Sequence, residues 1–192
     1  MGRSHRLNRR AAALAFLAAA HLASATPSDA KVLLSQDEAL KLAFPEARVE
    51  RRTAFLDESE LEEVHRLAGA GVSASRAMVP YYLASAEGRP VGAAYFDTHT
   101  VRTEAETIMV VVLPGDRIGR IEVIAFEEPQ DYLPTPAWID QFRGRPLDDE
   151  LAMKRGIRPM TGGTLTARAI TAAARRVLAL HKVIMPFGEP EP

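Results

Sequence analysis

The chain has 192 residues, with 24 basic and 25 acidic side chains and no cysteine. A chain without cysteine has no disulfide, no thiolate metal site and no haem attached through thioether bonds. Its length suits one domain that is stabilised by its own hydrophobic core.

The first 25 residues have the parts of a secretory signal peptide. A basic start is followed by an apolar stretch over residues 11–22 and by Ala23-Ser24-Ala25, a typical cleavage site. The apolar stretch is shorter than the roughly 20 residues that a membrane-spanning helix needs, which favours cleavage over a retained anchor. We therefore expect an exported, periplasmic protein that begins at Thr26. Cleavage would leave 20 basic against 25 acidic residues, which argues against nucleic acid as a partner.

Residues 26–78 are expected to add a helix, a strand and a second helix to the same domain. Ser35 and Glu38 form a capping-box pattern ahead of a short helix that a proline ends. Alternating residues over 49–55 predict the strand, and an amphipathic run over 59–68 predicts the second helix.

From residue 79 onward the pattern changes to strands. Two hairpins are predicted, one from residues 79–86 and 91–98 and the other from residues 107–113 and 117–126. The second hairpin begins with a continuous apolar run, which is typical of a strand covered on both faces by helices. A short helix opened by Pro136 should follow. These features predict an α+β domain with a small, largely antiparallel sheet of about four strands, a core over residues 79–185 and a proline-rich tail at 186–192.

Residues 160–166, Met-Thr-Gly-Gly-Thr-Leu-Thr, lead into the longest amphipathic helix of the chain. Its buried face is predicted from residues at helical spacing: Thr166, Ala169, Ile170, Ala173, Val177 and Leu180. Its opposite face is predicted to carry Arg168, Thr171, Arg175 and Lys182. The first turn of such a helix has free backbone N–H groups and the positive end of the helix dipole, which favour a bound anion. The two glycines let a phosphate group approach closely, although similar runs also serve as ordinary helix caps.

This loop resembles the attachment motif of the FMN-binding domain family, Ser/Thr-Gly-Ala-Thr followed by an apolar residue and Ser/Thr. That family includes flavin subunits of sodium-translocating NADH:quinone reductase and of Rnf-type complexes. Residues 79–182 contain further landmarks of its stand-alone members in the expected order: Asp97-Thr98-His99, Val101-Arg102-Thr103, Phe126-Glu127-Glu128-Pro129, Tyr132, Trp138-Ile139 and Gln141-Phe142-Arg143-Gly144.

The resemblance implies FMN as the cofactor, joined by a flavin transferase through a phosphoester to Thr164. It also implies a set of cofactor-binding residues: Thr161, Gly162, Gly163, Thr164, Leu165, Thr166, His99 and Arg102. The residues themselves favour Thr164, since Thr166 begins the buried face and Thr161 precedes the glycines. The chain departs from the family pattern at Gly163, where alanine is usual, and at Arg158, where an acidic residue is common. Non-covalent FMN therefore stays an alternative.

His99 and Arg102 are expected just past the end of a strand, where they would donate to reduced flavin and raise its potential. The alternative for His99 is a strand-end hydrogen bond with Asp97. The alternative for Arg102 is a surface ion pair with Glu104 or Glu106.

Two aromatic residues, Tyr132 and Trp138, either flank a flavin ring or serve only in packing. His65 has no other candidate ligand at metal-site spacing, so it is interpreted as a surface or packing residue and no metal site is predicted. No Gly-x-Ser-x-Gly elbow or comparable arrangement supports a catalytic residue.

The leading interpretation is an exported FMN protein that carries electrons, rather than a stand-alone enzyme. Such a carrier implies a redox partner protein, and a membrane-bound one fits the family resemblance. The competing interpretation is a non-redox secreted binding module that uses the same loop for a non-covalent ligand containing phosphate.

Overall fold

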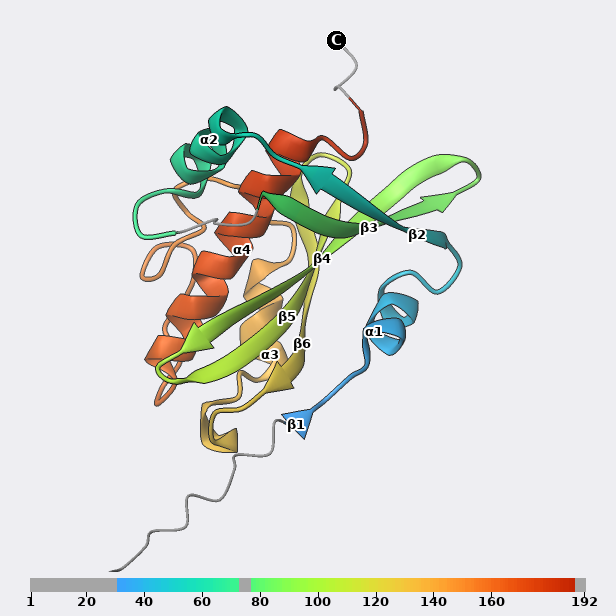
Figure 1. Ribbon diagram of the computed structural model, residues 1–192. Coiled ribbons are helices and arrows are strands. Elements are labelled where there is room, and N and C mark those ends of the chain that lie inside the picture. Colours follow the sequence, from blue (N-terminus) through green and yellow to red (C-terminus); the bar gives the residue numbers. More distant parts are fainter. Residues whose placement is uncertain (1–30, 73–76, 189–192) are drawn as a thin grey trace, which may run out of the picture.

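The computed structural model describes residues 31–72 and 77–188, so the predicted signal peptide lies outside the described residues. The described chain forms an antiparallel sheet with helices on both faces, in the strand order β1-β6-β5-β4-β3-β2 (Figure 1). This arrangement confirms the predicted α+β class. Within these residues, no helix is long and apolar enough to cross a membrane.

The sheet has six strands, so the expected number of about four is wrong. The two extra strands lie at its edges. β1 (Lys31–Val32) pairs with β6, and β2 (Arg48–Phe55), which was expected as a strand, pairs with β3 along its whole length. Both come from the N-terminal part of the chain, whose pairing partners are distant in sequence.

The two predicted hairpins are confirmed. β3 (Met78–Ala86) and β4 (Arg89–Val101) are joined by Glu87 and Gly88, which both have positive φ, as a tight hairpin turn requires. β5 (Glu104–Leu113) and β6 (Arg117–Phe126) form the second hairpin.

β4 continues beyond the predicted end at residue 98. Because β5 begins at Glu104, the two strands stay paired until Val101 lies opposite Glu104. His99 is therefore inside a strand, so its expected place past a strand end is wrong. Arg102 does lie in the turn that follows β4.

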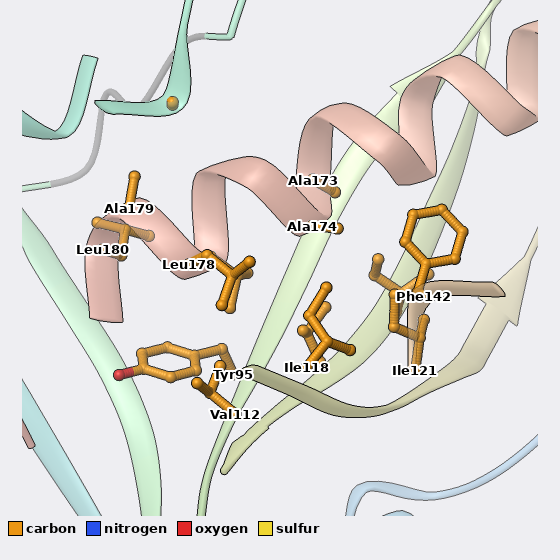
Figure 2. Close-up of a cluster of buried hydrophobic side chains, with 14 of the residues drawn as sticks. Tyr95, Val112, Ile118, Ile121, Phe142, Ala173, Ala174, Leu178, Ala179 and Leu180 are labelled. Carbon is orange, nitrogen blue, oxygen red and sulfur yellow. The ribbon is translucent and has the colours of Figure 1, made fainter. Parts of the chain in front are cut away.

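β5 lies inside the sheet and has a hydrophobic core on each face, as its apolar run predicts. Ile108, Val110 and Val112 belong to the core beneath the C-terminal helix, whereas Met109 and Val111 belong to the core beneath the first helix. Figure 2 shows part of the first core, in which side chains of the sheet meet those of the C-terminal helix. This two-sided burial explains why the strand has no polar alternation.

The helices agree with the predicted ones to within one or two residues, and two short 3₁₀ segments accompany α3. Their bounds are α1 Gln36–Ala43, α2 Glu58–Ala68, η1 Gln130–Tyr132, α3 Pro136–Ile139, η2 Asp140–Phe142 and α4 Thr164–Ile184. The capping box predicted for α1 is present: Ser35 Oγ accepts from the Glu38 backbone N–H, and Glu38 accepts from the Ser35 backbone N–H. α2 begins with the same motif.

α4 runs antiparallel to β4 along one face of the sheet (Figure 1). Tyr95 contacts His181 near the end of α4, and two residues later Asp97 contacts Arg176, which lies further back along the helix. The start of α4 therefore lies toward the β4–β5 turn.

The expected one-sided packing of α4 is wrong at two positions. Thr171 is buried, and its hydroxyl donates to the carbonyl of Ala167. Arg175 is only partly exposed and donates to the carbonyls of Ala68 and Leu151. α2 and the loop before α4 cover this second side, which helical spacing alone does not reveal.

Candidate functional site

The loop 160–166 ends at the first residue of α4. Thr164 occupies that position with an exposed side chain, and Thr161 and Leu165 are also exposed. Thr166 is 2% exposed and packs inward, as its place on the predicted buried face requires. Of the hydroxyls of Thr164 and Thr166, only that of Thr164 is accessible to a ligand or to a modifying enzyme.

The two glycines before Thr164 have different roles. Gly162 has a φ of +79°, a left-handed conformation that favours glycine, and no atom lies within 4 Å of where a Cβ would stand. Gly163 has an ordinary φ of −108°, but a Cβ there would overlap the terminal methyl of Met160 and lie 3.5 Å from the carbonyl oxygen of Tyr132. The alanine usual in the resembling family would thus require only that the flexible Met160 side chain shift.

The start of α4 differs from the starts of the other α-helices in the described chain. α1 and α2 carry capping boxes with acidic residues in the first turn, and Thr135 caps α3. α4 has neither a side-chain cap nor an acidic residue in its first turn, and Arg168 lies one turn along. The free N–H groups and the helix dipole are therefore not offset by the protein's own side chains.

Arg102 connects this loop to the β4–β5 turn. Its guanidinium carbon lies 4.6 Å from the centre of the Tyr132 ring, a cation–π contact. The carbonyl oxygen of Tyr132 lies beside Gly163. The turn after β4, η1 and the start of α4 therefore meet at one end of the molecule, and we call this meeting point the cradle.

Trp138 is a packing residue. Its ring packs against Phe142 at 65° and its Nε1 donates to the carbonyl of Arg158 over 2.8 Å. The Arg158 backbone N–H also donates to the side-chain oxygen of Gln141. Both the N–H and the carbonyl of Arg158 are therefore hydrogen-bonded, although the residue is exposed.

His99 lies between two carboxylates. Its Nδ1 is 2.9 Å from Asp97 Oδ1, and its Nε2 is 3.0 Å from Glu106 Oε2. Arg176 donates to both oxygens of Asp97, over 2.8 and 2.7 Å. The structure thus contains the Asp97–His99 bond considered as an alternative, and Glu106 pairs with His99 and not with Arg102.

These contacts change the pKa values of the groups involved. Burial alone would raise the pKa of Asp97, but the hydrogen bonds from His99 and Arg176 lower it to about 2. Burial alone would lower the pKa of His99, but its bonds to Asp97 and Glu106 raise it to about 9. Burial raises the pKa of Glu106 above its ordinary value. His99 is therefore a cation at neutral pH.

The burial of two carboxylates was not expected from the sequence. Glu106 is 0% exposed and Glu128 5% exposed, and in each the Oε1 atom has no hydrogen-bond partner. A signal for Glu106 was present, because it is two residues before Ile108 and in phase with the residues of β5 that face α4. For Glu128, which lies in a loop, no such pattern exists.

The two largest of the hollows described here lie away from the cradle. One of about 610 Å³ lies between β6 and the segment 133–143, and one of about 1100 Å³ lies at the C-terminal end of α4. Residues 160–166 line neither. At the second hollow, burial lowers the pKa of His181 to about 4.

His65 lies exposed on α2. In the part of the chain that the structure describes, no group of three or more His, Cys, Asp or Glu side chains is arranged to hold a metal ion.

No family model, curated protein or solved structure that was compared with the chain matches it.

Proposed function

We propose that this is an exported flavoprotein that carries electrons on FMN, with the FMN phosphate esterified to Thr164 Oγ1. Support comes first from the start of α4. The longest helix of the described chain begins at an exposed threonine, after a left-handed Gly162, with no side-chain cap and no acidic residue in its first turn. A helix start of this kind stabilises a phosphate group placed against it.

The residues at the cradle fit a phosphate-bearing ligand. Backbone N–H groups of the first turn of α4 would hold the phosphate, and open space beside Gly162 allows the approach. Arg102, Arg158 and Arg168 add positive charge around the loop, and each is exposed. Arg158 replaces an acidic residue common in the resembling family, and here it contributes to the same attraction.

FMN, when bound, supplies the one- and two-electron chemistry, and the protein supplies its attachment and surroundings. Two observations support a role for Arg102 beside the flavin ring: it is exposed in the turn after β4, and its guanidinium contacts the face of Tyr132. Both ring nitrogens of His99 are held by carboxylates. His99 therefore has no ring nitrogen left to donate a hydrogen bond to a flavin, and in this proposal its only effect on the flavin is electrostatic.

The proposed function requires two protein partners. A flavin transferase would form the phosphoester at Thr164, and a redox partner, membrane-bound in the related complexes, would exchange electrons with the flavin. Export to the periplasm favours a covalent link, because a dissociable cofactor would be lost there.

The experiment is coexpression of the full chain with a flavin transferase, in wild-type, Thr164→Val and Thr161→Val forms. Wild type and Thr161→Val should show in-gel flavin fluorescence after denaturation, a mass increment on the peptide containing Thr164, and reversible bleaching by dithionite. Thr164→Val should lose the fluorescence and the increment. Thr161→Val is the matched control, because it removes another exposed hydroxyl from the same loop.

Two results would contradict the proposal in different ways. A flavin label that persists in Thr164→Val would move the attachment to another residue. A colourless wild-type protein, produced beside an active transferase, would favour the alternative of a non-redox module that binds another phosphate-containing ligand.

A further inference from the structure

The two edges of the sheet are covered to different extents. On the outer side of β6, the Ile118 backbone donates to Arg145 and accepts from Gly144, and β1 pairs with the other end of the strand. β2 forms the opposite edge, and its eight residues pair with β3 on one side only. In the described chain, no backbone hydrogen bond reaches the outer side of β2. The N–H and C=O groups on that side are therefore free to pair with another strand.

β2 lacks several of the features that usually prevent an edge strand from pairing. It is eight residues long, contains no proline and keeps an unbroken register with β3 from Arg48 to Phe55. By contrast, register shifts interrupt the β3–β4 and β5–β6 pairs. Charge is the protective feature that β2 does have, because the strand carries three arginines and one glutamate.

The charge of β2 is mainly positive. Glu50 forms ion pairs with Arg48 over 3.0 Å and with Arg52 over 3.3 Å, and these three residues share one face of the strand. Arg51 belongs to the other face and is exposed, and its side chain has no ion pair with the described residues. One carboxylate is thus shared by two of the three arginines, which leaves positive charge along the edge.

This charge discriminates between strands that could pair with β2. Antiparallel pairing with β2 of a second copy over all eight residues would place Arg51 of each copy opposite Arg52 of the other. Like charges that lie directly opposite each other destabilise a strand pair. Carboxylates at the same two positions would form ion pairs instead. The edge therefore disfavours a second copy in this register and favours an acidic strand.

An apolar contact lies at one end of the same edge. Phe55 is 76% exposed, the highest value among the exposed large hydrophobic residues of the described chain, and it lies opposite Met78 of β3. Side chains of a strand alternate between its two faces, so Phe55 is on the same face as Arg51. A complementary strand would therefore carry an acidic residue and an apolar residue four positions apart.

We propose that β2 binds an extended, acidic segment of a partner protein, which adds to the six-stranded sheet as a further strand. Main-chain hydrogen bonds along β2 would hold the segment, and its side chains would provide specificity. Carboxylates would lie opposite Arg51 and Arg52, and an apolar side chain opposite Phe55. The pairing is antiparallel, as in every strand pair of this sheet.

The test measures binding of a fluorescein-labelled peptide, Val-Thr-Val-Glu-Glu-Thr-Val-Glu, to the full chain by fluorescence anisotropy. Antiparallel pairing places its first valine opposite Phe55 and its two central glutamates opposite Arg52 and Arg51. Binding should be saturable and should weaken as salt is added. A peptide with lysine in place of each glutamate should bind at least about tenfold more weakly, because attraction becomes repulsion.

Backbone pairing is tested with two further peptides, each methylated on alternate backbone nitrogens so that together they cover both phases. Only alternate N–H groups of a strand face its neighbour. One methylated peptide should therefore lose binding, and the other should keep it.

Arg51→Glu should weaken binding of the acidic peptide about tenfold and strengthen binding of the lysine peptide. Arg155→Glu is the matched control, since it reverses an exposed arginine in the loop before α4, and it should change neither affinity. The peptide comparisons use wild-type protein, so they decide the question even if a variant fails to fold.

Four results would overturn the proposal. The acidic peptide could fail to bind, or the acidic and lysine peptides could bind equally. Equal affinities of the two methylated peptides would show that the backbone of β2 is not used. A wild-type dimer in analytical ultracentrifugation that the acidic peptide does not dissociate would assign the edge to a second copy. These measurements need no bound flavin, so their outcome is separate from that of the proposed function.

Discussion

His99 illustrates how a side chain that looks functional in sequence acquires a structural partnership. It lies on β4 between Asp97 and Glu106, and Asp97 is in turn held by Arg176 on α4. The ion pairs are largely buried, so solvent screens them less than it would screen a surface pair. His99 therefore ties two neighbouring strands together and, through Asp97, joins them to the helix.

The first prediction concerns the pH dependence of stability. His99 has an ordinary pKa of 6.5 when unfolded and a pKa of about 9 in the folded protein. Its contribution to the unfolding free energy is thus complete below pH 6.5 and is lost as the pH rises through about 9. The size is about 3 kcal/mol, at 1.36 kcal/mol per pKa unit. Urea unfolding at several pH values should show this decline in wild type and a flatter profile in His99→Gln.

His65→Gln provides the matched control, since His65 lies exposed on α2. Its profile should follow that of wild type. Equal slopes for wild type and His99→Gln would show that the bonds to Asp97 and Glu106 do not hold the imidazolium in solution.

Helix α4 combines two features that oppose each other. Its sides are covered by the sheet, by α2 and by the loop that precedes it, yet its first residue is exposed and its first turn has no cap. The many buried contacts further along the helix hold the uncapped turn in place. A turn held by packing is free to use its N–H groups for a ligand.

The second prediction concerns the glycines before this turn. Gly162→Ala should lower the unfolding free energy by about 1–2 kcal/mol, because a side chain in the left-handed conformation is strained. Gly163→Ala should change it by less than about 0.5 kcal/mol, since φ there is ordinary and only Met160 must shift. Urea midpoints would measure both. Equal stability of Gly162→Ala and wild type would mean that the loop does not need a left-handed residue at 162.

Across the molecule, polar contacts fasten α4 to the sheet at two levels. Tyr95 and His181 meet near the C-terminal end of the helix over 3.0 Å, and Asp97 and Arg176 meet further toward its start. The hydrophobic core shown in Figure 2 fills the space beneath the helix. The cradle therefore stands on a rigid base, which suits a group that must be held in one position.

The third prediction concerns the exported form of the chain. If residues 1–25 direct export and are removed, the intact mass of protein recovered from the periplasm should begin at Thr26. Ala25→Arg should block cleavage, because the signal requires a small residue there, and should leave a heavier form. Wild-type protein that keeps Met1 and remains with the membrane would show that the segment is an anchor.

Local patterns in the sequence predicted much of the fold. Capping residues located the helices, and two turns located the hairpins. The apolar run of β5 correctly indicated burial on both faces. The spacing after the glycines also distinguished exposed Thr164 from buried Thr166. Each of these properties depends on neighbours within a few residues, so periodicity and cap chemistry are sufficient to predict it.

Contacts between distant segments were decided by the tertiary structure alone. The edge positions of β1 and β2, the continuation of β4 to Val101 and the second covered side of α4 all depend on partners far along the chain. The same holds for the ion pair of Asp97 and Arg176, which are 79 positions apart. A charged residue at a strand position whose side chain faces the core needs a hydrogen-bonding or oppositely charged partner. Which side chain meets that need is determined only when the strands and α4 have packed together.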